Sequence, residues 1–196
     1  MSQKSAVRKN TETIAVGGII AAMAIVIGLY KFPIFSFTPF LEFDFADLAI
    51  ILLTVTGGLI QGISCLAVVC FVQAFPMGGH GLTGFTMHFA ASCALLIVIG
   101  LICKNKKNIA NLIVAVILGS IAMTVVMIPM SYIFYPGFGI PISVSEPLPA
   151  MSVNNLLFPY IIPFNLIKSG VNSVCAVLLF YLLMPFLRKT GLIKSK

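Results

Sequence analysis

The feature that most constrains this chain is a series of long apolar runs joined by short charged or Pro- and Gly-rich connections. Four runs, residues 13–30, 85–103, 109–135 and 164–186, are long enough for a helix to cross a hydrocarbon layer of ~30 Å. Among 196 residues only 12 are Lys or Arg and 5 are Asp or Glu, too few for the polar surface of a soluble domain. The sequence therefore predicts an all-α integral membrane protein in a lipid bilayer.

The fifth apolar run, residues 45–75, is too long for one span and is interrupted by Gly57-Gly58. We interpret it as two shorter, tilted helices, residues 45–56 and 59–75, with a tight turn between them. The prediction is then six transmembrane helices in a single membrane domain that covers residues 1–196.

Basic side chains orient the predicted helices. Ten of the twelve lie before residue 10, at residues 104–107 or after residue 187, whereas the acids Glu42, Asp44, Asp47 and Glu146 lie in the other connections. The positive-inside rule places the basic clusters, and so both termini, in the cytoplasm. Six crossings satisfy this rule. The net charge of +7 therefore reflects membrane orientation and does not indicate nucleic-acid binding.

Several chemistries are not indicated. The sequence has no P-loop, H-E-x-x-H or G-x-S-x-G motif, and His80 and His88 are too few for a metal site. The five cysteines lie in or at the ends of apolar runs without a disulfide or metal spacing. We predict no catalytic residues, no metal and no cofactor. The alternative of a small membrane enzyme would need His88, Lys168 or Tyr132 to have a partnered carboxylate in the membrane, and none is expected.

The first run has a basic flank, but no small-x-small cleavage site follows it. We expect an uncleaved signal anchor in a prokaryotic plasma membrane.

Asn165 and Lys168 are the strongest candidates for a binding site. They lie three residues apart, shortly after Pro163, at the predicted start of the last span. A cation near a helix N-terminus in an apolar span is electrostatically unfavourable, so an acceptor-rich group should compensate it. A ligand is one such group. The alternative is that Lys168 snorkels to the outer headgroups and Asn165 satisfies a helix end.

The connection before the second span holds six phenylalanines and two prolines in residues 32–45. Such a stiff aromatic segment suits a lid over a flat apolar ligand, and the alternative is an aromatic belt at the membrane interface. Asp44 and Asp47 are interpreted as an N-cap and a first-turn acid of the second helix.

Small residues recur at a spacing of four in the first span: Gly17 with Ala21, and Gly18 with Ala22. A small-xxx-small face lets another helix approach closely. The approaching helix could belong to a partner protein or to the same bundle.

The chain resembles the substrate-binding S components of energy-coupling-factor (ECF) vitamin transporters. The resemblance rests on the basic N-terminus, the small-xxx-small face, Pro-Phe-Leu-Glu-Phe-Asp-Phe-Ala-Asp-Leu at 39–48 and Ile-Pro-Phe-Asn-Leu-Ile-Lys at 162–168. The resemblance covers essentially the whole chain and is strongest to the riboflavin-specific type. It implies a six-helix fold with the ligand held near the outer surface.

The resemblance also implies site residues. Asn165 and Lys168 match the polar pair expected to hydrogen-bond the polar edge of a flavin, and Phe40 and Leu41 lie where the lid would contact its ring. His88 and Ser131 stand where the family pattern has Asn. Replacing two amides changes the hydrogen-bonding groups offered to a ligand.

The function implied is capture of riboflavin, with delivery through a membrane coupling protein that contacts the first helix at Gly17, Gly18, Ala21 and Ala22, and with two separate ATPases. Riboflavin is the transported ligand, and because of the two departures another vitamin or flavin relative, such as pantothenate, thiamine or FMN, stays open.

Overall fold

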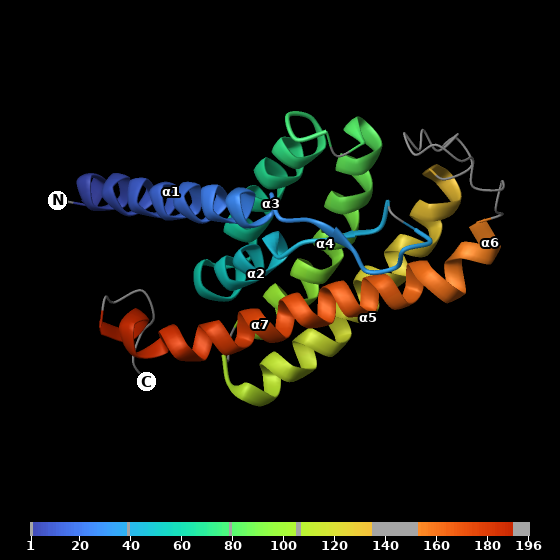
Figure 1. Ribbon diagram of the computed structural model, residues 1–196. Coiled ribbons are helices and arrows are strands. Elements are labelled where there is room, and N and C mark those ends of the chain that lie inside the picture. Colours follow the sequence, from blue (N-terminus) through green and yellow to red (C-terminus); the bar gives the residue numbers. More distant parts are fainter. Residues whose placement is uncertain (1, 39, 79, 105–106, 135–152, 190–196) are drawn as a thin grey trace.

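The computed structural model describes residues 2–38, 40–78, 80–104, 107–134 and 153–189. These residues form helices and one short two-stranded ribbon, so the all-α class is confirmed (Figure 1). The elements in chain order are α1 (Ser2–Ile27), β1 (Phe32–Pro33), β2 (Glu42–Phe43), α2 (Ala46–Gly57), α3 (Leu59–Ala74), α4 (Gly81–Cys103), α5 (Ile109–Phe134), α6 (Val153–Leu156), the π-helical turn η2 (Leu157–Ile161) and α7 (Ile162–Lys189).

The helix boundaries follow the apolar runs most closely in the middle of the chain. Helices α2, α3 and α5 begin and end within one residue of the predicted positions. In contrast, α1 begins at Ser2 instead of residue 13 and ends at Ile27 instead of residue 30, and α4 begins at Gly81 instead of residue 85. The early start of α1 has a local reason, because Lys, Arg and Gln in the residues before the apolar run are also good helix formers.

The last helix begins earlier than predicted. The chain is continuously helical from Val153 to Pro185, through α6, η2 and α7, whereas the prediction placed a connection up to Pro163. Pro159 lies within η2, where the wider turn accommodates a residue that has no backbone N–H. Lys168 therefore lies about four turns after the start of helical structure, so the argument that it opposes a helix N-terminus was wrong. The rest of the predicted connection, residues 135–152, lies outside the described residues.

Helix length and hydropathy separate two groups. Helices α4, α5 and the helical stretch Val153–Pro185 are long and apolar enough to cross a membrane, whereas Thr13–Ile27, α2 and α3 are shorter apolar helices. The count of six spans therefore stays a prediction. Helix α1 begins and α7 ends at the same end of the molecule, as an even number of crossings requires (Figure 1).

The turn between α2 and α3 is made by Gly58, whose φ of 102° favours glycine. The two helices approach closely at Gly62, where an added Cβ would overlap Thr54 Oγ1. Lys107 Nζ donates to the carbonyl oxygen of Thr56 over 3.4 Å. The basic loop between α4 and α5 and the turn after α2 therefore lie at the same end of the bundle, as the charge pattern predicts.

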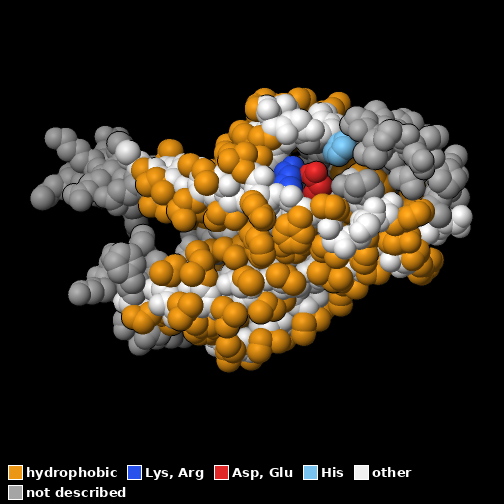
Figure 2. Space-filling model, in the orientation of Figure 1, with side chains coloured by type: hydrophobic (Ala, Val, Ile, Leu, Met, Phe, Trp, Pro, Cys, Tyr) orange, Lys and Arg blue, Asp and Glu red, His pale blue; other side chains and the backbone are white. Residues whose placement is uncertain are grey.

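The main core lies between α1, α2, α3, α4, α5 and the middle of α7. Helices α4 and α5 share the most extensive contact between two helices of the described structure, and at Gly119 an added Cβ would lie 2.8 Å from Leu95 Cδ1. Large apolar side chains such as Ile60, Leu101 and Ile133 are exposed on the outside. Figure 2 shows hydrophobic side chains over most of the described surface on one face. This distribution is typical of a bundle surrounded by lipid.

Candidate functional site

The aromatic loop, residues 32–45, folds over the end of the bundle away from the chain termini. Strand β1 pairs with β2 in an antiparallel ribbon, in which Phe32 is opposite Phe43. Lys31 Nζ lies 3.3 Å from Glu42 Oε2 at the surface beside this ribbon. The ribbon and the ion pair hold the two ends of the loop together.

The loop and η2 share a second hydrophobic cluster. Leu41 and Phe43 are 4% and 3% exposed, and they cluster with Ile161 of η2 and Phe164 of α7. Phe40 is partly buried against the same cluster. The loop is therefore folded inward at Leu41 and Phe43, which fits the lid interpretation better than an interfacial belt.

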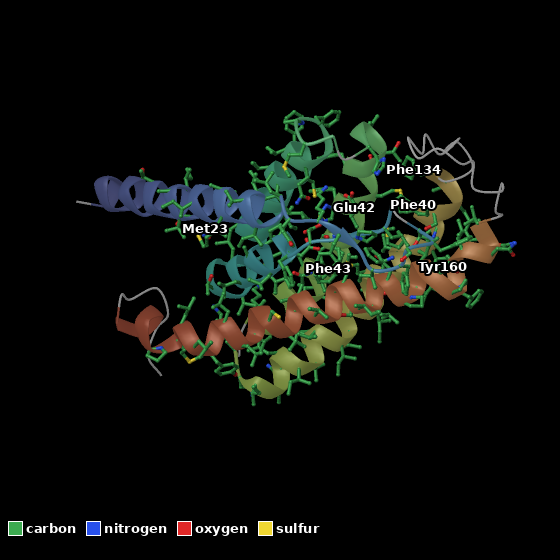
Figure 3. All side chains as sticks on the ribbon, viewed as in Figure 1. Met23, Phe40, Glu42, Phe43, Phe134 and Tyr160 are labelled. Atoms are coloured by element: carbon green, nitrogen blue, oxygen red, sulfur yellow. The ribbon has the colours of Figure 1, made fainter. Side chains whose placement is uncertain are left out.

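Tyr160 is the aromatic centre of this region. Its ring is stacked on Phe37 and meets Phe35 edge to face, with ring centroids 5.6 Å apart in both pairs. Phe40, Phe134 and Tyr160 all lie toward the end of the molecule away from the termini, where the loop, α5 and η2 meet (Figure 3). Aromatic and aliphatic side chains from three elements therefore form an apolar wall suited to a flat ring.

Directly below this wall lies a buried ion pair. Lys168 Nζ of α7 donates to Asp44 Oδ2 over 2.8 Å, and both side chains are less than a tenth exposed. Asp44 Oδ1 accepts from the backbone N–H of Ala46, the first residue of α2, over 2.9 Å. The predicted N-cap position of Asp44 was wrong by one residue, because the N-cap of α2 is Phe45. Asp44 still binds the first N–H of α2 from the preceding position, and its other carboxylate oxygen binds Lys168.

Asn172 connects the same two segments through their backbones. Its Nδ2 donates to the carbonyl oxygens of Asp44 and Lys168, at 3.0 Å in each case. Lys168 is held deep in the bundle by these contacts and is 6% exposed. The alternative that it snorkels to the headgroups was therefore wrong.

A second buried acid lies on α2. Asp47 is 2% exposed, and its Oδ1 lies 3.3 Å from both His88 Nε2 and Ser92 Oγ of α4. The expectation that no carboxylate partners His88 or Lys168 was wrong. It failed because Asp44 and Asp47 were assigned only to the end of α2, whereas the fold packs that end between α4 and α7.

Asn165 and Ser131 use their donors within their own helices. Asn165 Nδ2 donates to the carbonyl oxygen of Ile161 over 2.8 Å, at the junction of η2 and α7. Ser131 Oγ donates to the carbonyl oxygen of Met127 over 2.7 Å. Both side chains are buried, and their oxygen lone pairs remain for a further hydrogen bond. Their roles toward a ligand stay predictions.

A polar stripe on α7 was missed by sequence reasoning beyond its first two members. Its residues recur at three- and four-residue spacings and are all buried: Asn165, Lys168, Ser169, Asn172 and Ser173. Such a stripe in an apolar helix is readable from the sequence as one polar face. The pairing of its members with Asp44 is not readable, because it depends on the packing of α2 against α7.

The small residues of α1 divide between two faces. Ala21 is 6% exposed and packs in the core, whereas Gly18 and Ala22 are exposed and Gly17 is half-buried. An added Cβ would meet nothing within 4 Å at Gly17 or Gly18. Packing within the bundle therefore accounts for Ala21, and the outward face of α1 is unpartnered in the described structure.

Comparison with known proteins identifies the family of this chain. The family described as "ECF transporter, substrate-specific component" matches residues 12–180. The chain belongs to this family. Its members are substrate-specific components of transporters and not enzymes, which decides against the alternative of a small membrane enzyme, and they bind a transported substrate without a cofactor.

Relatives in three bacteria resemble the chain over most of its length. The riboflavin transporter RibU of Staphylococcus aureus (strain TCH60) is 31% identical over 173 residues, covering 87% of this chain and 89% of the relative. RibU of Streptococcus thermophilus (strain ATCC BAA-250 / LMG 18311) is 25% identical over 92% of this chain and 86% of its own length, and the riboflavin transporter FmnP of Bacillus subtilis (strain 168) is 25% identical over 90% and 94%.

A solved structure supports the fold. The S component of a bacterial ECF transporter superposes with a TM-score of 0.76 at 30% identity, covering 91% of this chain and 99% of that one. The S-component fold of this chain is therefore established.

The ion pair of Asp44 and Lys168 should stabilise the ligand-free protein. Lys168→Met leaves a buried carboxylate without its cation and should lower the free energy of unfolding by about 3–5 kcal/mol. Asp44→Asn should cost a similar amount, and the double variant should lose less than the sum. Thermal denaturation of the detergent-solubilised protein measures these differences.

The matched control is Glu42→Gln, which removes a carboxylate from the exposed pair with Lys31. It should cost less than ~1 kcal/mol. Lys168→Met and Asp44→Asn variants that are as stable as Glu42→Gln would contradict the role assigned to the buried pair.

Proposed function

We propose that this chain is the riboflavin-capture subunit of an ECF-type importer in a bacterial plasma membrane. The observation that carries the proposal is the adjacency of an apolar, aromatic wall and a buried polar layer at one end of the bundle. The wall contains Leu41 and Tyr160, and the polar layer contains Asn165 and Lys168. A flavin has the matching shape, a flat ring with one polar edge. The names of the three relatives support the same ligand.

In this proposal each predicted site residue has a distinct role. Phe40 and Leu41 cover the isoalloxazine ring from the aromatic loop. Asn165 and Lys168 hydrogen-bond its polar edge, and Lys168 can donate to the ligand while it stays bound to Asp44, because an ammonium group has three N–H donors. His88 and Ser131 complete the polar surface from α4 and α5.

The groups at His88 and Ser131 bear on ligand choice. A site built to hydrogen-bond one set of polar groups rejects a ligand that leaves a buried group unpaired. Riboflavin is the first choice because the aromatic loop and the relatives both favour it. Another vitamin or flavin relative, such as pantothenate, thiamine or FMN, is the outcome to test against it.

Delivery across the membrane would require partners. We infer a six-span topology with both termini in the cytoplasm, a membrane coupling protein and two ATPase subunits. The absence of a P-loop in this chain supports a separate source of ATP hydrolysis. The exposed small residues Gly18 and Ala22 of α1 offer the coupling protein a surface for close helix packing, with Gly17 at its edge and Ala21 on the buried side.

Purified protein should carry yellow flavin absorbance and quench riboflavin fluorescence saturably at micromolar concentration. Asn165→Ala should weaken binding about 10-fold, because the ligand loses a hydrogen-bonding partner in a buried site. Asn155→Ala, at an exposed position of α6, is the matched control and should bind like the unmodified chain.

Colourless protein that does not quench riboflavin fluorescence would sink the riboflavin proposal. Shifts of the melting temperature on addition of pantothenate, thiamine or FMN then identify which alternative ligand, if any, the protein binds. Mass spectrometry of the ligand extracted from purified protein provides an independent identification.

The outward face of α1 should carry the contact with the coupling protein. Gly18→Leu and Ala22→Leu add bulk to exposed positions, so they should leave riboflavin binding intact and abolish co-purification of the coupling protein with its ATPases. Ala21→Leu is a poorer test, because Ala21 is buried in the bundle. Val125→Phe, on the exposed face of α5, is the control and should preserve the complex. A complex that survives both α1 substitutions would exclude this surface.

A further inference from the structure

Asp47 is a buried acid that the proposed function leaves without a role. It lies in the first turn of α2, and its side-chain hydrogen bonds are made with His88 and Ser92 of α4. Oδ1 lies 3.3 Å from both His88 Nε2 and Ser92 Oγ, whereas Oδ2 is buried and has no hydrogen-bond partner among the described residues. A buried carboxylate with one unpaired oxygen is costly unless a cation lies beside it.

With Asp47 ionised, the charges around it balance only if His88 is counted as a cation. Asp44 is already paired with Lys168 at 2.8 Å. That pair is neutral in sum, so Asp47 would leave one net negative charge in the interior of the bundle. Within the described residues, the only basic group in hydrogen-bonding distance of Asp47 is His88. Lys168 interacts with Asp47 more weakly, at longer range.

His88 is also accessible enough for its side chain to contact a ligand. Its side chain is 18% exposed, whereas Asp47 behind it is 2% exposed. The ring therefore stands between the buried acid and accessible space. An imidazolium ring carries N–H donors on both nitrogens and offers no acceptor. With Nε2 bound to Asp47, Nδ1–H is the remaining donor, and beside the ring the thiol of Cys70 of α3 is only a weak acceptor.

We propose that Asp47 is the counter-ion of His88 and a positioning residue of the ligand site. Asp47 holds His88 in its charged, donor-only form, with Ser92 fixing the carboxylate from one turn further along α4. The α4 side of the site then selects a ligand group that accepts hydrogen bonds, such as a ring carbonyl oxygen. This inference rests on the proposed function for the identity of the ligand, but the pairing of Asp47 with His88 does not.

A double-mutant cycle tests the pairing. The four proteins are the unmodified chain, Asp47→Asn, His88→Asn and the double variant. Asp47→Asn should weaken riboflavin binding about 10-fold, because His88 loses its anion, whereas the same substitution in the His88→Asn background should change the affinity less than ~3-fold. Glu42→Gln, which removes a carboxylate with no contact to His88, should have the same effect in both backgrounds.

The possible outcomes of this cycle distinguish a counter-ion from a structural acid. An equal loss on Asp47→Asn in both backgrounds would overturn the counter-ion role and leave Asp47 as a structural acid of α2. If Asp47→Asn alone cannot be purified but the double variant can, the pairing is supported, and if neither can be purified it is overturned.

The ligand-free proteins separate this inference from the proposed function. If the unmodified chain does not bind riboflavin, the proposed function fails, and the melting temperatures of the four proteins still decide the pairing. Asp47→Asn should then lower the melting temperature by about 4 °C more in the unmodified chain than in the His88→Asn background. Equal shifts in the two backgrounds would overturn it.

Discussion

The rest of the structure depends on the buried ion pair between Lys168 and Asp44. One partner lies on α7 and the other at the end of the aromatic loop, 124 residues earlier in the chain. The pair fixes the loop over η2. The other carboxylate oxygen of Asp44 accepts a hydrogen bond from the backbone N–H of Ala46, the first residue of α2. Because each buried charge is costly without the other, the loop, α2 and α7 are held in one arrangement. The apolar wall and the polar layer meet in consequence of that arrangement.

The sequence made Lys168 conspicuous for a sound reason, since a cation in an apolar run needs a compensating group. It could not name that group. Asp44 had a sufficient local explanation as a helix cap, and nothing in a single sequence shows that one carboxylate serves two partners. Asp47 was missed in the same way, because its contacts with His88 and Ser92 arise only when α2 packs against α4. Apolar runs and short connections therefore predicted most of the helices, and long-range polar pairs needed the fold.

Two further differences have local causes. The helix containing Lys168 begins at Val153 and passes through Pro159, because a π-helical turn tolerates a residue without an N–H. The sequence pattern had placed Pro159 in a connection and Pro163 at the first turn of the helix. The small residues of α1 show the reverse limit: a spacing of four marks a face, but burial decides that Ala21 packs inside while Ala22 lies outside. Periodicity predicts which residues share a face, and packing decides what that face contacts.

The ion pair lies at the base of the flavin site that we propose. A crystal or electron cryo-microscopy structure of this chain with riboflavin bound tests it most directly. We predict that the isoalloxazine ring lies between the aromatic loop and η2, with its polar edge in hydrogen-bonding distance of Lys168 and Asn165. Lys168 should still be bound to Asp44. A flavin bound elsewhere, or a Lys168 side chain that contacts neither Asp44 nor the ligand, would contradict it.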